Sequence, residues 1–457
     1  MAVSRVLVAN RGEIAVRIIR ACHALGVEAV VAVSEADRDS LPARLANRAV
    51  CIGPPPPRES YLRIEALIAA AQGTGCDALH PGYGFLAEAP ELANACAAHG
   101  LTFVGPRADS IRQMGHKLAA RALAAEHGIP TAPGSARVRT AAEAAAVAQE
   151  IGFPVIVKAA AGGGGRGIKV VEDAAALGGV LEIAAAEARA AFGDDALYLE
   201  RYVAHARHVE VQVLGDRHGQ VIHLGERDCS LQRRYQKIVE EGPAAFVADA
   251  AREGMRAAAV RLAAAIGYES AGTVEFLYDQ DTEAYYFLEM NTRIQVEHPV
   301  TELITGADLV QAQLRIAGGE PLPFAQDAVR LVGHAIECRI TAESAPHGFR
   351  PCPGTITRWS APSGPGVRVD THCYAGYTVP RYYDSLLAKL IVHGADRAQA
   401  LARLRMALAT FDVGGIDTTI SFLHALVGDP AFVAGQVNTR WVEEKLAAAR
   451  GPRAGGH

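Results

Sequence analysis

Apolar residues in the first hundred positions alternate between short continuous runs and helical spacing. RVLVA (5–9) and EAVVAVS (28–34) are short and rich in valine, which predicts buried strands, and IAVRIIRACHAL between them has the spacing of a helix. This alternation continues to about Gly105 and is typical of a parallel sheet covered by helices. A single glycine, Gly12, follows the first run, so it predicts a tight strand-to-helix turn rather than a dinucleotide-binding fingerprint.

The pattern changes after this region. Residues 116–150 are rich in alanine and predict helices, and FPVIVKAA (153–160) begins a new unit in which two strands flank a glycine run. Further strands are predicted at 208–216, 273–278 and 285–291, followed by helices and a mixed region at 331–393. We predict a multidomain α/β and α+β protein, with units at 1–115, 116–204, 205–330 and 331–446 and a tail at 447–457.

Composition and charge narrow the class of protein. Of 457 residues, 50% are hydrophobic and 21% charged, as in ordinary globular enzymes, and the net charge of -5 argues against a mainly electrostatic grip on nucleic acid or an anionic membrane. No signal peptide and no apolar span of about 20 residues occurs, so we expect a cytoplasmic protein. The cysteines form no C-x-x-C pair, which predicts buried or half-buried free thiols at Cys22, Cys51, Cys76, Cys96, Cys229, Cys338, Cys352 and Cys373.

The segment PVIVKAAAGGGGRGIKVV (154–171) contains four successive glycines. Without a Cβ, such residues let backbone N–H groups turn toward an anion and cradle phosphate oxygens. No Gly-Lys-Ser/Thr follows, which argues against a P-loop. We interpret the segment as a hairpin lid over the phosphates of a nucleotide, with Lys158 on the strand that leads in. The alternative is a surface loop without function.

Two glutamates lie in a predicted hairpin. TVEFLY and YYFLEMN flank the turn DQDTE, and antiparallel pairing places Glu275 approximately across from Glu289. Facing carboxylates repel unless a positive group lies between them. Mg²⁺ is the simplest such group, and Asn291 offers a further oxygen ligand. The alternatives are that the two side chains face opposite sides of the sheet or pair with arginines.

Polar side chains crowd the segment NTRIQVEHPVTE (291–302), which follows the second of these strands. The guanidinium of Arg293 is a planar fork that suits bicarbonate or phosphate, and a carboxylate such as Glu297 can remove a proton. Gln295 and His298 lie between and beside them. The alternative is an ordinary solvated loop.

A last charged segment is DCSLQRRYQKIVEE (228–241). Arg233, Arg234 and Lys237 lie beside Glu240 and Glu241. Taken alone, this pattern favours a solvated, charged strand and loop.

Together these segments closely resemble biotin carboxylase, a member of the ATP-grasp superfamily. The resemblance covers essentially the whole chain, and its most specific part is EMNTRIQVEHPVTE; the others include VANRGEIAVRIIRAC (8–22), HPGYGFLAE (80–88), RDCSLQRRYQK (227–237) and YYDSLLAKLIVHG (382–394). It implies a Rossmann-like N-terminal domain at 1–115 and an ATP-grasp lid subdomain with linker at 116–204. It also implies an ATP-grasp catalytic subdomain at 205–330 and a C-terminal mixed β domain at 331–446.

The resemblance implies a nucleotide site in the two central units. Phosphates would be bound by lysines and by the lid, adenine by the linker after the lid, and ribose by the neighbouring strands. The ATP contacts that we predict in this way are Lys117, Lys158, Gly164, Gly165, Glu200, Arg201, Tyr202, Val203, His208, Gln232, Tyr235, Glu275 and Glu289.

It also implies the sites for the metal and the smaller substrates. Mg²⁺, or Mn²⁺, would be held by Glu275, Glu289 and Asn291, with a second ion arriving with ATP. Bicarbonate would be bound by Lys237, Arg293, Gln295 and Val296. Glu297 would deprotonate bicarbonate, and Arg339 would bind biotin and stabilise its enolate. Arg293, Glu297, Lys237 and Arg339 are thus the predicted catalytic residues.

The implied reaction is ATP-dependent carboxylation of biotin by bicarbonate through carboxyphosphate, which is a ligase reaction that forms a C–N bond. No Ala-Met-Lys-Met-like biotinylation site occurs. We therefore expect biotin to arrive on a separate biotin carboxyl carrier protein and carboxyltransferase subunits to use the product, in acetyl-CoA carboxylase or a propionyl-CoA or pyruvate carboxylase. A homodimer is expected, and neither nucleic acid nor membrane is expected as a partner.

Some positions depart from the family's pattern. Tyr235 stands where histidine is common, Ala161 where many members have glycine, and Arg201 where lysine is usual. These residues concern nucleotide affinity and the closing of the lid rather than the metal or bicarbonate. Two other functions are weighed: a nucleotide-binding subunit without catalysis, and another ATP-grasp ligase that joins an amine to an acyl phosphate.

Overall fold

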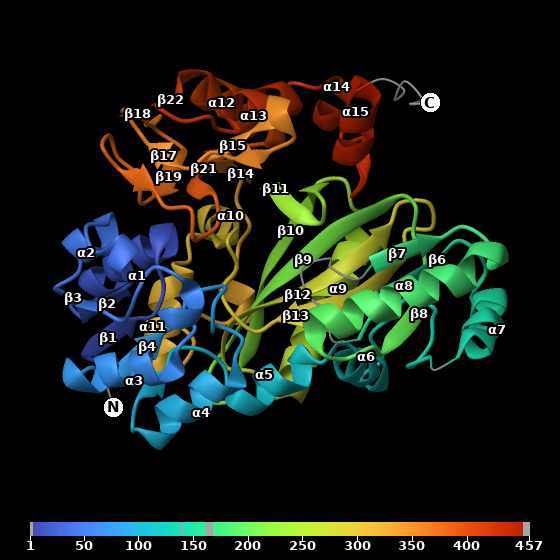
Figure 1. The fold of residues 1–457 in the computed structure, drawn as a ribbon, viewed down its shortest axis with the longest axis horizontal. Coiled ribbons are helices and arrows are strands. Elements are labelled where there is room, and N and C mark those ends of the chain that lie inside the picture. Colours follow the sequence, from blue (N-terminus) through green and yellow to red (C-terminus); the bar gives the residue numbers. More distant parts are fainter. Residues whose placement is uncertain (1–2, 139, 161–167, 451–457) are drawn as a thin grey trace.

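The computed structural model describes residues 3–138, 140–160 and 168–450. At its N-terminal end lies a parallel five-stranded sheet of order β3-β2-β1-β4-β5, whose central strands are buried as expected of apolar runs covered on both faces (Figure 1). The strands are β1 (Arg5–Val8), β2 (Glu28–Val33), β3 (Arg48–Cys51), β4 (Ala78–His80) and β5 (Thr102–Phe103). The helices are α1 (Gly12–Ala24), α2 (Leu41–Leu45), α3 (Ile64–Gly73), α4 (Pro90–Ala98) and α5 (Ala108–Gly115). The predicted parallel α/β unit is confirmed.

Helix α1 carries charged residues into the interior. Its first residue, Gly12, has φ +68°, which glycine adopts without strain, and the predicted tight turn is confirmed. α11 (Leu309–Ala317) and β19 (Val367–Thr371) also pack against α1. As a result Glu13 and Arg17 are buried, and α1 joins the N-terminal sheet to the rest of the molecule.

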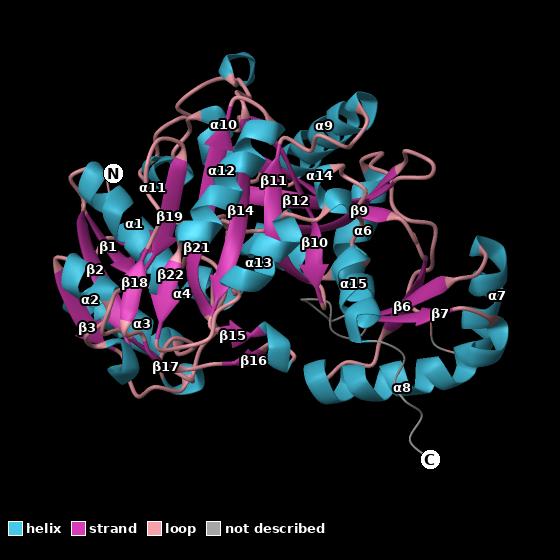
Figure 2. Ribbon diagram, turned by 90° about the horizontal axis from the view of Figure 1, so that it is seen from above, coloured by secondary structure: helices cyan, strands magenta, loops and turns pink. Residues whose placement is uncertain are grey.

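A small three-stranded sheet, β7-β6-β8, forms a unit of its own at the right of both views (Figure 2). β6 (Val155–Ala159) pairs antiparallel with β7 (Ile168–Val171), as predicted, and with β8 (Leu197–Arg201). α7 (Ala141–Ile151) and α8 (Ala174–Phe192) pack on it through alanines and small aliphatic residues, and α6 (Lys117–Glu126) precedes them. Ala161, Gly164 and Gly165 of the glycine run lie outside the described residues.

The largest sheet has eight strands in the order β13-β12-β9-β10-β11-β14-β21-β19, and all its pairs are antiparallel. Its first five strands come from the predicted catalytic subdomain, and the last three come from the predicted C-terminal domain. They are β9 (Ala206–Gly215), β10 (Val221–Arg233), β11 (Gln236–Gly242), β12 (Ser270–Asp279), β13 (Tyr285–Asn291), β14 (His334–Thr341), β19 and β21 (Leu386–Gly394). The strand segments predicted at 208–216, 273–278 and 285–291 are confirmed.

Helices cover this sheet on both faces. α9 (Asp249–Ala265) packs on β9 and β10, α10 (His298–Thr305) lies over β10, β11, β14 and β21, and α12 (Arg397–Thr410) lies against β14 and β21. The other C-terminal helices are α13 (Ile420–Val427), α14 (Pro430–Val433) and α15 (Trp441–Arg450). Short strands complete the C-terminal region: β15 (Glu343–Ser344), β16 (Arg350–Pro351), β17 (Gly354–Thr355), β18 (Arg358–Ser360), β20 (Thr378–Val379) and β22 (Asp412–Gly414).

The cysteines and the helices bear on two expectations from the sequence, free thiols and the absence of a membrane span. The cysteines are free thiols, as predicted, but Cys51 is exposed because it ends β3 at the edge of the N-terminal sheet. Among the described residues, no helix has both the length and the apolar character needed to cross a membrane.

Candidate functional site

Lys237, near the start of β11, lies at the centre of a buried charge cluster. Its Nζ donates to Glu210 on β9 (2.5 Å), Glu275 on β12 (2.8 Å) and Glu297 before α10 (2.7 Å). Burial alone would lower the pKa of Lys237, but these three carboxylates outweigh it and raise the pKa well above its ordinary value. The prediction of a solvated segment at 228–241 is therefore wrong for Lys237, Glu240 and Glu241, because the hairpin β10–β11 places them in the sheet, whereas the hairpin tip at 234–236 is exposed as predicted.

Glu210 was not predicted from the sequence. It is fully buried on β9 and also accepts from Nε of Arg227 at 2.7 Å, so two cations share it. Its signal was a charged residue inside the apolar run HVEVQV, where an unpaired carboxylate would be costly.

The two glutamates of the β12–β13 hairpin face each other, as predicted. Glu275 pairs with Glu289, whereas Phe276 pairs with Phe287, so Leu288 is the extra residue of a bulge beside the pair. Glu275 also accepts from Asn291 Nδ2 at 2.9 Å. Burial would raise the pKa of Glu275, but Lys237 and His208 outweigh it and lower the pKa strongly. Glu275 is therefore ionised.

Glu289 is the more open member of the pair, with its side chain 30% exposed and 3.2 Å from Nζ of Lys117. Two carboxylates and the side-chain oxygen of Asn291 thus lie on adjacent strands, which is a donor set that suits Mg²⁺. Among the described residues, the groups that pair with the two carboxylates are ammonium, imidazole and amide groups: Lys117, Lys237, His208, Asn291 and Gln295. The residues present fit a magnesium ion.

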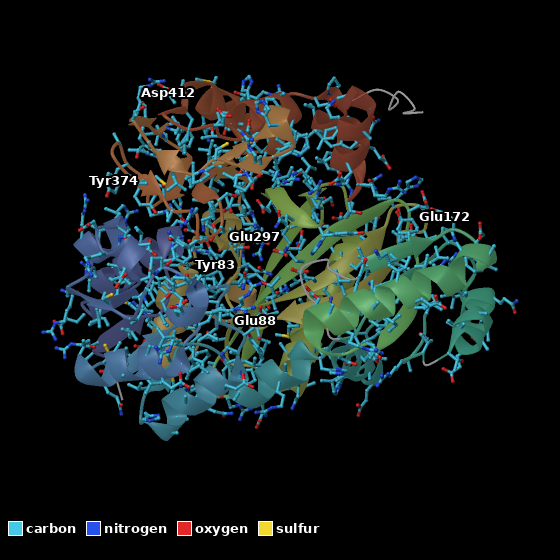
Figure 3. The ribbon with its side chains drawn as sticks, in the orientation of Figure 1. Tyr83, Glu88, Glu172, Glu297, Tyr374 and Asp412 are labelled. Carbon is cyan, nitrogen blue, oxygen red and sulfur yellow. The ribbon has the colours of Figure 1, made fainter. Side chains whose placement is uncertain are left out.

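Arg293 is held at the boundary between the N-terminal unit and the large sheet. Its Nε donates to Glu88 at 2.8 Å, its NH1 to Gln295 at 2.9 Å and its NH2 to Asn291 at 3.0 Å. Glu88 also accepts from the backbone N–H of Thr292. Figure 3 labels Glu88 and Glu297 in this central region, close to where the N-terminal unit meets the large sheet. Glu88 was missed, although it ends the quoted segment HPGYGFLAE.

Glu297 joins two cations that come from different strands. Its Oε1 accepts from Lys237, and its Oε2 accepts from NH2 of Arg339 on β14 at 2.9 Å. Burial would raise the pKa of Glu297, but Lys237, Arg339 and Arg227 outweigh it and hold the pKa well below its ordinary value. His298 begins α10 and is fully buried, so the alternative of an ordinary solvated loop is wrong from His298 onward.

The predicted adenine linker lies at the end of β8 and just after it. Glu200 is buried and forms ion pairs with Lys158 and, at 2.9 Å, with Arg121. The hydroxyl of Tyr202 accepts from Arg440 at 3.0 Å, which ties the linker to the residue before α15. Arg201 is exposed, and Val203 is half-buried.

The predicted ribose residues divide into two groups. His208 and Gln232 are buried beside each other, with 2.8 Å between Gln232 Nε2 and His208 Nδ1, and Nε2 of His208 lies 3.1 Å from Glu275. Tyr235, in contrast, lies at the tip of the β10–β11 hairpin, where its side chain is 54% exposed and its φ is +63°. The structure therefore brings His208 and Gln232 to the metal candidate but leaves Tyr235 at the surface.

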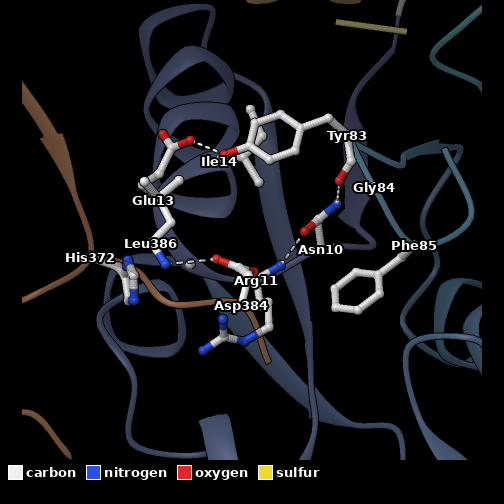
Figure 4. A pocket seen from close by; sticks show the side chains of 11 residues that line it. Asn10, Arg11, Glu13, Ile14, Tyr83, Gly84, Phe85, His372, Asp384 and Leu386 are labelled. Carbon is white, nitrogen blue, oxygen red and sulfur yellow. Dashed lines mark hydrogen bonds between the residues drawn. The ribbon is translucent and has the colours of Figure 1, made fainter. Parts of the chain in front are cut away.

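A pocket lies between α1, the loop after β4 and the start of β21 (Figure 4). Tyr83 on its wall donates its hydroxyl hydrogen to Glu13, and burial raises the pKa of Tyr83 well above its ordinary value. Glu13 in turn lies 3.1 Å from Nζ of Lys389, which donates to the backbone oxygen of Val296 at 2.8 Å. Lys389, also missed from the sequence, thus connects the pocket wall to the segment that contains Glu297.

Comparisons with known proteins agree over the whole chain. Family models match residues 2–111 (biotin carboxylase, N-terminal domain), 116–325 (carbamoyl-phosphate synthase L chain, ATP binding domain) and 337–444 (biotin carboxylase C-terminal domain). The chain is 50% identical to biotin carboxylase 1 of Bacillus subtilis, with 96% of this chain and 98% of the relative covered. It is 52% identical to biotin carboxylase of Pseudomonas aeruginosa, with 97% and 98% covered.

Solved structures give the same result. The biotin carboxylase–β,γ-ATP complex of Campylobacter jejuni matches with a TM-score of 0.94 at 45% identity, covering 97% of this chain and 99% of that one. The biotin carboxylase domain dimer of Hydrogenobacter thermophilus 2-oxoglutarate carboxylase, in complex with MgADP, ADP and bicarbonate, matches with a TM-score of 0.93 at 46% identity, covering 97% and 98%. This chain belongs to the biotin carboxylase family.

Proposed function

We propose that this chain uses ATP and bicarbonate to carboxylate the biotin of a separate carrier protein. The observation that carries the proposal is the position of Glu297 between Lys237 and Arg339. One of these cations belongs to the predicted bicarbonate site and the other to the predicted biotin site. A base held between them can take a proton from one substrate while it stays next to the second.

The bicarbonate site would consist of Lys237, Arg293, Gln295 and the backbone of Val296. Gln295 is 4% exposed and already aligned by Arg293, which supports a prearranged anion site. In this site Glu297 takes the bicarbonate proton, and the two cations attract the resulting dianion toward the nucleotide.

The nucleotide would lie between the three-stranded sheet β7-β6-β8 and strands β12 and β13. Lys117, Lys158, Gly164 and Gly165 are the proposed phosphate contacts, and Glu275, Glu289 and Asn291 would hold Mg²⁺. The magnesium ion neutralises phosphate charge when it is bound. The contacts of Lys117 with Glu289 and of Lys158 with Glu200 support this arrangement, because each ammonium group already lies beside another predicted ATP contact.

The proposed reaction then has three steps: a displacement at phosphorus, a breakdown and an addition to CO₂. A bicarbonate oxygen bonds to the γ-phosphorus as the bond to the ADP oxygen breaks, which gives carboxyphosphate. Its carbon–oxygen bond breaks to release CO₂ and phosphate, and the phosphate takes the ureido proton of biotin. The ureido nitrogen bonds to CO₂, while Arg339 stabilises the negative oxygen of the biotin enolate.

We also propose a biotin carboxyl carrier protein and carboxyltransferase subunits as partners and a homodimer as the assembly. The relatives named biotin carboxylase and the dimeric Hydrogenobacter structure support these partners.

The test is ATP hydrolysis by the purified chain with and without bicarbonate and free biotin. We expect hydrolysis to depend on bicarbonate and to rise further with biotin. A hydrolysis rate that bicarbonate and biotin leave unchanged would exclude the proposal. Transfer of an acyl group to an added amine would favour another ATP-grasp ligase.

A further inference from the structure

A second pair of glutamates faces across the large sheet, behind Arg339. Glu240 on β11 is the direct cross-strand partner of Glu337 on β14, so both side chains lie on the same face. That face is covered by α10, whose Val300 and Ile304 pack against Ala335 of β14. Glu240 and Glu337 are both 0% exposed, so neither carboxyl group reaches bulk solvent.

Their oxygens are short of hydrogen-bond donors. Oε1 of Glu240 accepts from Nε of Arg339 at 2.6 Å. Oε2 of Glu240 and both carboxyl oxygens of Glu337 have no partner among the described residues. A buried, ionised carboxylate without a donor is strongly unfavourable, and two ionised groups across from each other are worse. One proton shared by the pair removes both problems, because a carboxylic acid is itself a donor.

No cation among the described residues donates a hydrogen bond to Glu337, and burial raises its pKa well above the ordinary value although the charges of Lys389 and Arg339 oppose this rise. Nζ of Lys389, on the neighbouring strand, is directed to Val296 and Glu13 instead. The charged groups that act on the pair from the elements around it are Lys237 on β11, Arg339 on β14, Lys389 on β21, and Glu297 before α10. The thiols of Cys229 on β10 and Cys338 on β14 also lie near the pair, and burial raises their pKa well above the ordinary value. Burial is the largest cause that raises the pKa of both carboxyl groups, and for Glu240 the pKa rises to about 7.

We propose that the carboxyl group of Glu337 is protonated in the working enzyme and donates a hydrogen bond to Oε2 of Glu240. Glu240 then holds Arg339 in place as an anion whose two oxygens both accept hydrogen bonds. The proton belongs on Glu337 because Glu240 already accepts from a guanidinium, whereas Glu337 accepts from no group among the described residues. Glu337 is thus a positioning residue, which acts on the reaction only through Glu240 and Arg339.

This role rests on the proposed biotin-carboxylating function and adds a condition to it. Arg339 divides its hydrogen bonds between Glu240 and Glu297. Ionisation of Glu337 places a further negative charge behind the guanidinium and weakens its attraction for the biotin enolate. Biotin-dependent turnover therefore needs Glu337 in its neutral form and decreases when the pH is high enough to remove this proton.

The proton can be observed without any activity. Infrared difference spectroscopy of the full chain, wild type minus Glu337→Gln at neutral pH, is expected to show the C=O band of a protonated carboxyl group. Absence of that band overturns the proposal. Since the measurement needs no substrate, its result is independent of whether the chain carboxylates biotin; the bicarbonate-dependence of wild-type ATP hydrolysis tests that separately.

The positioning role is tested by the pH profile of biotin-dependent turnover. In Glu337→Gln the amide still donates to Glu240 but cannot ionise, so we expect near-normal turnover at neutral pH and an alkaline decline displaced to higher pH. In Glu337→Leu, Oε2 of Glu240 loses its donor, and we expect turnover to fall roughly tenfold while biotin-independent ATP hydrolysis falls less. An alkaline decline in Glu337→Gln that coincides with the wild type would overturn the role.

Glu241→Gln is the matched control on the same strand. Glu241 points to the opposite face, where it accepts from His334 (2.8 Å) and Arg397 (2.6 Å) and touches no proposed substrate residue. Its replacement removes a buried carboxylate of the same size one position away. We expect it to leave both the carboxyl band and the pH profile of turnover unchanged; a displaced profile in this variant would assign the effect to general loss of stability and overturn the role of Glu337.

Discussion

The large sheet contains two cross-strand pairs of glutamates that differ in almost everything except their register. Glu275 and Glu289 face Lys237, Lys117 and His208, and Glu289 is partly open to solvent. Glu240 and Glu337 are sealed under α10, and Arg339 is their single hydrogen-bonding partner among the described residues. The environment of the first pair favours binding of a divalent cation, and the environment of the second pair favours retention of a proton. The charges that face a carboxylate pair, rather than the pair itself, decide its chemistry.

Replacing Glu275, one member of the first pair, should have the largest effect on activity. In Glu275→Gln, Lys237 and Asn291 lose an anionic partner and the proposed metal site loses a ligand, so we expect bicarbonate-dependent ATP hydrolysis to fall by about 100-fold or more. Rates measured over a series of magnesium concentrations check this, since excess metal should restore part of the rate. A loss below about threefold would show that the pair does not bind the metal.

Arg339 donates hydrogen bonds to both Glu240 and Glu297, and its loss should separate biotin carboxylation from ATP hydrolysis. For Arg339→Ala we expect biotin-dependent turnover to fall by about 100-fold and biotin-independent ATP hydrolysis to fall much less. Steady-state rates with and without biotin measure both. Equal losses in both assays would assign Arg339 to the phosphate site instead.

Lys389 connects the pocket wall to the segment that holds Glu297. In Lys389→Met, Glu13 becomes a buried charge without its cation and the oxygen of Val296 loses a donor, which should cost about 3–5 kcal/mol of folding free energy. A lower thermal midpoint checks this. Lys445→Met removes an ion pair with Asp429 nearer the surface and should change the midpoint little. Similar midpoints for the two variants would show that the buried contact contributes nothing.

The smallest effect concerns stability and pH, and its sign should differ between neighbouring glutamates. Contacts with His334 and Arg397 outweigh burial and lower the pKa of Glu241 to about 2, so its stabilisation is present above about pH 4.5 and is lost as the pH falls toward 2. For Glu240 and Glu337 the raised pKa makes the native state hold a proton that the unfolded chain releases, so stability decreases as the pH rises above about 4.5.

Acid and alkaline unfolding of Glu241→Gln and Glu337→Gln check these signs. We expect Glu241→Gln to lose the stabilisation that wild type has above about pH 4.5, and Glu337→Gln to lose stability less steeply than wild type as the pH rises above about 4.5. Curves parallel to wild type in both variants would contradict the assigned protonation states.

The sequence predicts local pairing well and distant pairing poorly. The turn DQDTE was enough to place Glu275 across from Glu289, because both strands lie within one hairpin. The short apolar runs before Gly105 were enough to predict a parallel sheet. In contrast, Glu337 meets Glu240 only because β14 joins the sheet of the preceding unit, and no local pattern encodes that pairing.

The same reason explains the residues that were missed. Glu88 and Lys389 are far in sequence from the residues they hold, Arg293 and Val296, so their roles depend on how the units pack. The charged segment at 228–241 was misinterpreted because its charges are neutralised by strands that the sequence does not place beside it. The domain limits and the assignment of each substrate contact remain predictions.

The most direct test of the central claim is the transfer of label from radiolabelled bicarbonate to free biotin by the wild-type chain and by Glu297→Gln. We predict ATP-dependent labelling of biotin by the wild type and none by Glu297→Gln, which should still bind ATP with near wild-type affinity because Glu297 lies among the bicarbonate and biotin residues. Labelling by Glu297→Gln at the wild-type rate would contradict its role as the base, and no labelling by the wild type would contradict the proposed function.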